Sequence, residues 1–269
     1  MFILSDPFDP SDPSDPSDLS DPSKAMEPQK QRMSKTYARM AAAEIPADTL
    51  ARAKALGYTE ADLRSVPEEA CTGLGCGNPT ALADLKPGET VLDLGCGGGF
   101  DAFLAAQKVG SNGKVIGVDM TPEMIEKAKR NAAKGGFGNV EFKLGEIEKL
   151  PVADGSVDAV ISNCVVNHAC RDKLNAFREA FRVLKPSGRM LVADLVTQGE
   201  IPQEVIAGLD EAWGGWFGAK PLGKQPYLDA IEQAGFRKIT IAKKHTFAHT
   251  GMDPRLEGKI ISIQVKAVK

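Results

Sequence analysis

The chain has 269 residues, of which 42% are hydrophobic, and this is enough to bury one large core or two smaller ones. A formal net charge of −3 without a basic stripe argues against nucleic acid or a membrane as partner, and no segment approaches the roughly 20 apolar residues of a membrane span. Five cysteines, an odd number, fit free thiols better than a disulfide framework, so we expect a cytoplasmic protein with a small-molecule ligand.

The N-terminal residues differ in composition from the rest. Serine, aspartate and proline recur as SDP units over residues 5–23, with almost nothing apolar to offset the entropy of ordering. We expect residues 1–28 to be a disordered acidic leader and assign it no function. Within residues 29–70, the pattern of apolar and capping residues predicts helices at 31–43, at 47–56 and after Thr59. Because they carry no obvious catalytic side chain, we expect them to form a helical cap over a site.

Strand and helix patterns alternate from residue 89 onward. The predicted strands are 90–94, 114–119, 140–144, 157–162 and 189–195, and the helices between them are 100–109, 122–134 and 173–184. A further helix at 226–234 precedes strands 238–243 and 260–265, which we expect to form an antiparallel hairpin at the sheet edge. The alternation predicts an α/β fold with a doubly wound, mostly parallel, seven-stranded sheet. Residues 71–200 would be its core, and residues 201–269 would complete the sheet and a substrate pocket.

A glycine-rich loop follows the first of these strands in the sequence LDLGCGGGF. Glycines at this place let the backbone approach a ligand closely. Asp119, at the end of the second strand, follows at the interval typical of an acid that binds ribose hydroxyls. The loop and the acid together predict a nucleoside cofactor. From this unit alone, a nicotinamide dinucleotide and S-adenosylmethionine both remain open.

Four blocks in order resemble the class I S-adenosylmethionine-dependent methyltransferases: VLDLGCGGG, VIGVDMTPEMIEKAKRNA, LGEIEKLPVADGSVDAVISN and FREAFRVLKPSGRMLVADLV. The resemblance implies a Rossmann-like fold and S-adenosylmethionine as cofactor. In that family the glycine loop holds the methionine moiety, the acid after the second strand holds the ribose, and the loop after the third strand flanks the adenine. By resemblance, the cofactor-binding residues are Asp93, Gly95, Gly97, Gly99, Asp119, Met120, Ile147, Glu148 and Asn163.

Within that superfamily, LGCGNPTALADLKPGETVLDLG, GVDMTPEMIEKA and ISNCVVN are similar to the arsenite methyltransferases. The resemblance implies that Cys76 and Cys164 bind the substrate and carry the catalysis. Thiolates suit trivalent arsenic because both are soft. The implied reaction is methyl transfer from S-adenosylmethionine to arsenite or its thiol conjugates. A reductant such as glutathione or thioredoxin would keep the thiols reduced.

The chain departs from that family in its cysteines. It lacks the paired cysteines that many relatives carry near the N-terminus, and it lacks a cysteine after the fifth strand, where Gly215 or Trp216 stands in EAWGGWFGAK. Either two thiols suffice to bind arsenic, or Cys71 or Cys170 supplies a third.

Other interpretations of the same residues stay open at this point. The chain is alternatively a methyltransferase for an organic small molecule, such as a quinone precursor or a lipid, or a non-catalytic protein that binds a metalloid or zinc through its thiols. A zinc site would use Cys71, Cys76, Cys164 and Cys170. Cys96, inside the glycine loop, is expected to be structural. His168 is a candidate base or ligand, or a helix cap.

Overall fold

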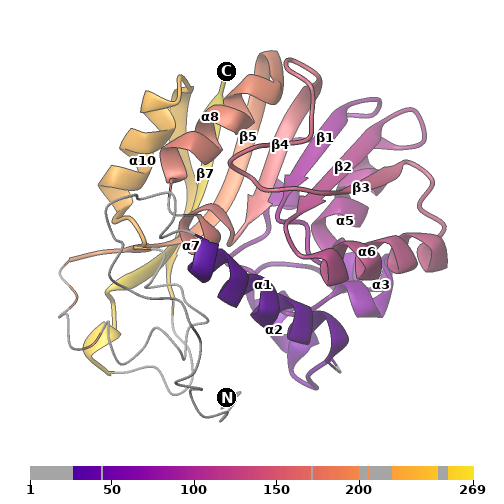
Figure 1. Cartoon of the computed structure of the whole chain (residues 1–269), viewed down its shortest axis with the longest axis horizontal. Helices are drawn as coiled ribbons and strands as arrows, with labels where there is room; N and C mark the ends of the chain where they lie inside the picture. The colour runs from indigo at the N-terminus through magenta and orange to yellow at the C-terminus, as the bar shows by residue number, and fades with distance from the viewer. Residues whose placement is uncertain are drawn as a thin grey trace.

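A seven-stranded sheet with the order β3-β2-β1-β4-β5-β7-β6 forms the centre of the computed structural model (Figure 1). The strands are β1 (Thr90–Leu94), β2 (Lys114–Asp119), β3 (Val140–Leu144), β4 (Val157–Asn163), β5 (Leu184–Thr197), β6 (Arg237–Thr246) and β7 (Ile260–Val268). Strands β1 to β5 are parallel, whereas β7 runs antiparallel to both of its neighbours, β5 and β6. The predicted doubly wound, mostly parallel sheet is confirmed. The last two strands pair as expected, but β7 inserts beside β5 and leaves only β6 at the edge.

The structure describes residues 27–43, 45–170, 172–199, 201, 205, 220–247 and 254–269. The α-helices there are α1 (Glu27–Ala42), α2 (Thr49–Ala55), α3 (Glu60–Arg64), α4 (Pro79–Leu82), α5 (Phe100–Val109), α6 (Pro122–Gly135), α7 (Val166–Ala169), α8 (Lys173–Val183) and α10 (Lys224–Gln233), and two short 3-10 helices are Glu68–Ala70 and Pro254–Leu256. Of these α-helices, only α4 and α7 were not predicted, because four residues are too few to show a helical period. The expectation of a disordered leader concerns residues that lie almost wholly outside the described ones.

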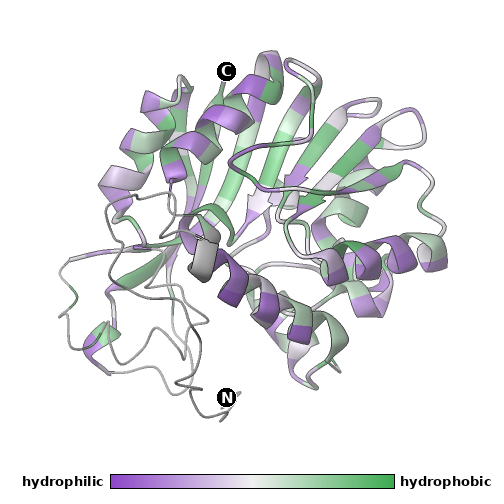
Figure 2. Ribbon diagram, viewed as in Figure 1, coloured by the Kyte–Doolittle hydropathy of each residue, from purple (hydrophilic) through white to green (hydrophobic). Residues whose placement is uncertain are grey.

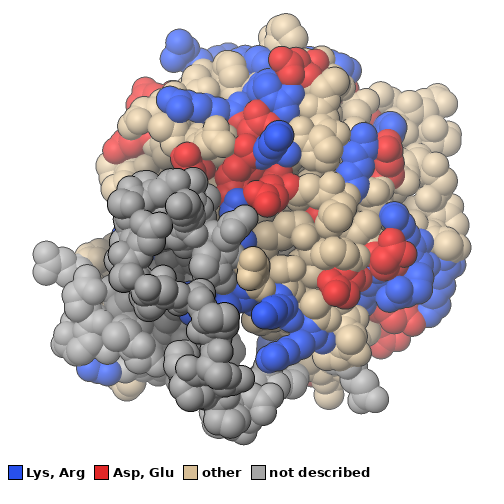
Figure 3. Space-filling model, in the orientation of Figure 1, with Lys and Arg blue, Asp and Glu red and all other residues tan. Residues whose placement is uncertain are grey.

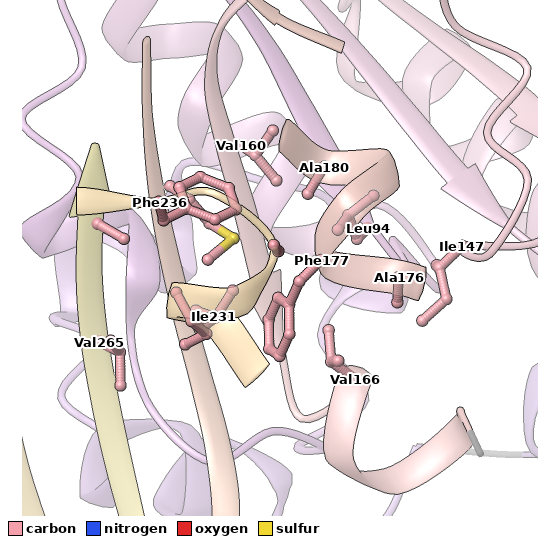
Figure 4. Packing of buried hydrophobic residues seen from close by; sticks show 14 of the residues in the cluster. Leu94, Ile147, Val160, Val166, Ala176, Phe177, Ala180, Ile231, Phe236 and Val265 are labelled. Atoms are coloured by element: carbon pink, nitrogen blue, oxygen red, sulfur yellow. The ribbon is translucent and has the colours of Figure 1, made fainter. Parts of the chain in front are cut away.

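Successive apolar side chains along the strands point to opposite faces of the sheet, so a hydrophobic core forms on each face. Leu92 and Leu94 belong to the cluster under α8 and α10, part of which, including Leu94 and Phe177, is drawn in Figure 4. The rings of Phe177 and Tyr227 meet edge to face there, with centroids 5.3 Å apart. Their neighbour Val91 belongs to the opposite cluster, with α5. Successive residues of a strand point to opposite faces, so the two-sided burial follows from the apolar runs. Figure 2 shows the strands mostly green and polar residues along the outer sides of the helices.

The order of the strands reverses between β1 and β4, and ligands in sheets of this type bind at the carboxyl ends of the strands at such a point. In Figure 1, α1 and α7 lie at this end of the sheet.

Lysine and arginine mix with aspartate and glutamate over the described part of the face in Figure 3. None of the helices in the described part of the chain has both the length and the hydropathy needed to cross a membrane.

Candidate active site

The loop between β1 and α5 has a backbone shape that only glycine adopts readily. Gly95 has φ +66°, and a Cβ atom there would lie 2.4 Å from Cγ2 of Val165. Gly97 also has a positive φ, +50°, and its amide donates a hydrogen bond of 2.9 Å to Oδ2 of Asp119. The other oxygen of Asp119 accepts from the amide of Thr121 at 2.9 Å. The acid at the end of β2 therefore fixes the loop at the end of β1.

A cavity of about 920 Å³ opens at this loop. Its size is at the upper end of the range for small-molecule sites. Of the predicted site residues, those that line it are Cys71, Asp93, Gly95, Gly97, Asp119, Met120, Ile147, Glu148, Asn163, Cys164 and His168. Gly99 has a packing role, because a Cβ there would lie 2.8 Å from the ring of Phe103 and 2.9 Å from that of Phe142. Predicted residues from five separate chain segments thus meet around one space.

Five acidic side chains line this cavity, and three of them, Asp93, Asp101 and Asp119, have a pKa raised by burial. The pKa of Asp101 rises to about 6. Burial disfavours the charged form of a carboxylate, and the neighbouring charges of Asp101 and Asp119 raise the pKa of Asp93 further. A cationic ligand would relieve this cost, so the lining favours a ligand that carries positive charge.

Helix α1 closes part of the cavity with Lys30 and Tyr37, which the sequence did not single out. Lys30 pairs with Glu148 at 3.1 Å and with Glu146 at 2.6 Å. The ring of Tyr37 meets that of His168 edge to face, with centroids 6.1 Å apart. Burial lowers the pKa of His168 to about 4, so the imidazole is neutral at neutral pH. The α1 helix is thereby attached to the loop after β3 and to α7.

Asn163, at the end of β4, joins the cofactor loop to the turn that carries Cys76. Its Oδ1 accepts from the amide of Cys76 at 2.8 Å, and its Nδ2 donates to Oδ2 of Asp101 at 3.0 Å. Tyr58 donates to Oδ1 of Asp101 at 2.7 Å and accepts from Asn163 at 3.0 Å. Every one of these atoms is at least partly buried, so the network fixes the position of the Cys76 turn relative to α5.

Cys76 and Cys164 meet in the structure and form a disulfide, with Cα atoms 5.3 Å apart. The expectation that all five cysteines are free is therefore wrong for these two. The physical reason is the hydrogen bond from Cys76 to Asn163, which holds the turn against the residue next to Cys164. Cys164 has φ +62°, a left-handed conformation that only about a few per cent of non-glycine residues adopt. Cys76 is fully buried, whereas Cys164 lines the cavity.

Asp194, on β5, lies beside this pair and was missed by the sequence analysis. One of its carboxylate oxygens and the two sulfurs all lie within 4.8 Å of one another. Its Oδ2 accepts from the hydroxyl of Tyr227 at 2.6 Å and from the amide of Asn167 at 3.3 Å, whereas Oδ1 is buried without a hydrogen-bond partner. Burial raises the pKa of Asp194 to about 7. An acidic residue inside the apolar run LVADLV was the available signal.

The other cysteines are free and lie in different parts of the core. Cys71 and Cys96 belong to the cluster with α5, and Cys170 to the cluster with α8, while Cys76 and Cys164 belong to a third cluster. Neither Cys71 nor Cys170 is in a group of ligand atoms within metal-binding reach among the described residues. The arrangement therefore does not support a four-cysteine zinc site. Gly215 and Trp216 lie outside the described residues.

Comparisons with known proteins agree on the kind of domain. The family model described as "Methyltransferase domain" matches residues 85–242. An arsenite methyltransferase of Halobacterium salinarum is 52% identical over 189 residues, covering 70% of this chain and 48% of that protein. One of Aquipseudomonas alcaligenes is 38% identical over 75% of this chain and 55% of that protein. The chain thus spans about half the length of these curated relatives.

A solved structure supports the same comparison at the level of the fold. The crystal structure of an arsenic(III) S-adenosylmethionine methyltransferase from Chlamydomonas reinhardtii superposes with a TM-score of 0.63. It is 32% identical in sequence, and the match covers 84% of this chain and 75% of that one.

Proposed function

Because this chain belongs to the arsenite methyltransferase family of S-adenosylmethionine-dependent methyltransferases, we propose that it transfers a methyl group from S-adenosylmethionine to trivalent arsenic held by Cys76 and Cys164. One observation carries the proposal: two cysteines 88 residues apart in sequence meet, with Cα atoms 5.3 Å apart, at the wall of the cavity that the glycine loop lines. Thiol pairs at this spacing suit a soft, small centre such as arsenic.

The cavity residues fit the cofactor in chemistry as well as in size. The backbone of Gly97 faces open space, since a Cβ there would meet nothing within 4 Å, and the loop leads into the N-terminus of α5. We propose that Gly95 and Gly97 hold the methionine carboxylate there, where helix N-termini favour anions. Asp93 and Asp101 would face the ammonium and sulfonium charges.

The adenosine half of the cofactor would be held by the loops after β2 and β3. We propose that Asp119 binds the ribose hydroxyls, next to Met120, and that Ile147 and Glu148 flank the adenine. All four line the cavity. Helix α1, with Tyr37 against His168, would cover the bound cofactor, so we propose that residues 29–70 act as a cap.

Arsenic capture requires the disulfide to be opened first. A thiol reductant such as glutathione or thioredoxin would supply two electrons and two protons and return two thiols. We propose that the chain works in a reducing compartment, the cytoplasm, for this reason. The two thiols then replace two hydroxyls of arsenite, and each thiol proton leaves with a hydroxyl as water.

Transfer needs no general base, because the arsenic lone pair is itself the nucleophile. Transfer of the electrophilic methyl group of S-adenosylmethionine would form an As–C bond as the S–C bond breaks, and S-adenosylhomocysteine would leave. Arsenic would become formally pentavalent, and the thiol reductant would supply the two electrons that return it to the trivalent state. The chain holds the two reactants in line: Asn163 ties the Cys76 turn to Asp101 on α5, which lines the cofactor cavity. Positioning of this kind contributes roughly 7 to 11 kcal/mol to a well-oriented reaction.

The test is an assay of the reduced full chain with S-adenosylmethionine, arsenite and glutathione. We expect S-adenosylhomocysteine and methylated arsenic to form together, and neither to form above background when arsenite is omitted. Absence of arsenic-dependent turnover would reject the proposal. Turnover of a quinone precursor or lipid instead would favour the organic-substrate alternative, and arsenite binding without cofactor consumption would favour a binding protein.

A further inference from the structure

Asp194 is an unusual residue to find next to a pair of sulfurs. Its side chain is 1% exposed, so its charge is almost wholly removed from water. Burial raises the pKa of Asp194 to about 7, and the hydroxyl of Tyr227, the backbone amides of Asn167 and Val166 and the charge of Lys173 act against that effect and favour the ionised form. The Tyr227 hydroxyl and the Asn167 amide donate to Oδ2, whereas Oδ1 has no hydrogen-bond partner. A buried acceptor without a hydrogen bond lowers the stability of the fold, because its lost hydration is not replaced. Nearly all buried acceptors therefore have a hydrogen-bond donor.

The chemistry of the substrate supplies that partner. Arsenite, As(OH)₃, forms two As–S bonds with Cys76 and Cys164, two As–O bonds break, and two water molecules leave with the two thiol protons. Arsenic stays trivalent and keeps one hydroxyl group. The remaining hydroxyl is a hydrogen-bond donor bound to an atom that bridges both sulfurs, and a carboxylate oxygen lies within 4.8 Å of each sulfur.

We infer that Oδ1 of Asp194 accepts a hydrogen bond from the hydroxyl that remains on thiol-bound arsenic, and that Asp194 thereby makes the site selective for arsenite over methylated trivalent arsenic. The inference rests on the proposed function. Methylarsonous acid, CH₃As(OH)₂, uses both of its hydroxyls to bind two thiols and presents a methyl group where arsenite presents a hydroxyl. A site with a polar group for a substrate hydroxyl rejects the analogue that lacks it, because that group is left unpaired.

The experiment measures the dissociation constants of arsenite and methylarsonous acid for the full chain, reduced with a phosphine, by equilibrium dialysis with arsenic detected by mass spectrometry. Dithiothreitol, a dithiol without a carboxylate, gives the reference preference between the two arsenicals. The preference is the dissociation constant of methylarsonous acid divided by that of arsenite. We expect this ratio to be at least about tenfold larger for the wild-type chain than for dithiothreitol. An equal preference in the chain and in dithiothreitol would overturn the inference, and this arm needs no variant to fold.

Asp194→Asn provides the second arm. The donors at Oδ2 direct the amide oxygen toward Tyr227 and Asn167, so the NH₂ group takes the place of Oδ1. We expect arsenite binding to weaken about 10- to 100-fold and methylarsonous acid binding to change less than about threefold. The matched control, Tyr227→Phe, removes a hydrogen bond from Oδ2 and leaves Oδ1 in place, so the preference should persist. Equal losses for both arsenicals in Asp194→Asn would show a structural role only and overturn the inference. Binding of neither arsenical by the reduced wild-type chain would instead reject the proposed function itself.

Discussion

The two halves of the site differ in how they are built. The cofactor half consists of the loops that follow adjacent strands, and the amides of Gly95, Cys96 and Gly97 join the loop after β1 to the end of β2 by hydrogen bonds. The thiol half gathers Cys76, Cys164 and Asp194 from three distant segments and contains a buried carboxyl group. The first depends on the backbone shape of neighbouring strands and turns, whereas the second depends on contacts between residues far apart in the sequence. Each half should therefore fail separately when its own residues are changed.

The largest effect is expected from the thiols. Cys164→Ser and Cys76→Ser should each lower arsenite methylation by roughly a thousandfold or more, because a hydroxyl does not capture the soft arsenic centre and positioning is lost. Product formation by mass spectrometry measures this, with S-adenosylmethionine binding by calorimetry as the control that should not change. If either variant kept most of its activity, the thiol pair would not be the arsenic site.

The next largest effect is expected from a substitution in the cofactor half of the site. Asp119→Ala removes the acceptor that holds Gly97 and is proposed to bind the ribose, so S-adenosylmethionine binding should weaken about 10- to 100-fold. Arsenite binding by the reduced protein should stay the same. Asp84→Asn, at an exposed aspartate paired with Lys86, is the matched control. Loss of arsenite binding in Asp119→Ala would contradict the separation of the two halves.

Tyr58 tests the network that links the halves. Tyr58→Phe deprives buried Asp101 and Asn163 of a hydrogen-bond partner, so the free energy of unfolding should fall by about 1 to 3 kcal/mol. Because the Cys76 turn is held through Asn163, kcat should fall about tenfold, with little change in the KM for S-adenosylmethionine. An unchanged kcat in a destabilised variant would mean that the network is structural and does not position the thiols.

The smallest effect on activity is expected from His168, which lies where α1 and α7 meet. Its pKa is about 4 in the folded chain and near 6.5 when unfolded, so the unfolded chain binds the proton more tightly between these values. This residue therefore lowers stability as the pH falls from 6.5 to 4, by on the order of 2 kcal/mol at pH 5. Buried Asp101 and Asp194, whose pKa values are raised, act in the opposite direction.

His168→Leu isolates that contribution. Urea unfolding of the wild type and the variant at pH 7 and pH 5 should show that the variant loses less stability on acidification. Equal losses in both proteins would mean that His168 is protonated in the folded chain and that α1 does not bury it.

The cofactor half was predictable because its signals are local. The apolar run before Gly95 and the acid at Asp119 lie within one strand, loop, helix and strand unit, where chain order fixes the geometry. The pairing of Cys76 with Cys164 was predictable only through the resemblance to a family. Their disulfide was not predicted, because sequence composition says nothing of the hydrogen bond from Cys76 to Asn163 that brings them together.

Three of the side chains that escaped prediction did so for a common reason. Tyr58, Tyr37 and Asp194 reach the site from a turn, a helix and a strand that are remote from it in sequence. Within its own segment, each of these residues fits an ordinary structural role, so the local sequence does not mark it as part of a site. Only the packing of α1 and α2 over the strand ends, and of β5 beside β4, gives them their roles. The residues that come together only through such long-range contacts are therefore identified by the structure and not by the sequence.

The central claim is that two thiols hold arsenic at the wall of the cofactor cavity. X-ray absorption at the arsenic edge, on the reduced full chain with one equivalent of arsenite, tests it most directly. The account predicts two sulfur neighbours and one oxygen neighbour around each arsenic atom. Three sulfur neighbours, or an arsenic atom surrounded by oxygen alone, would contradict it.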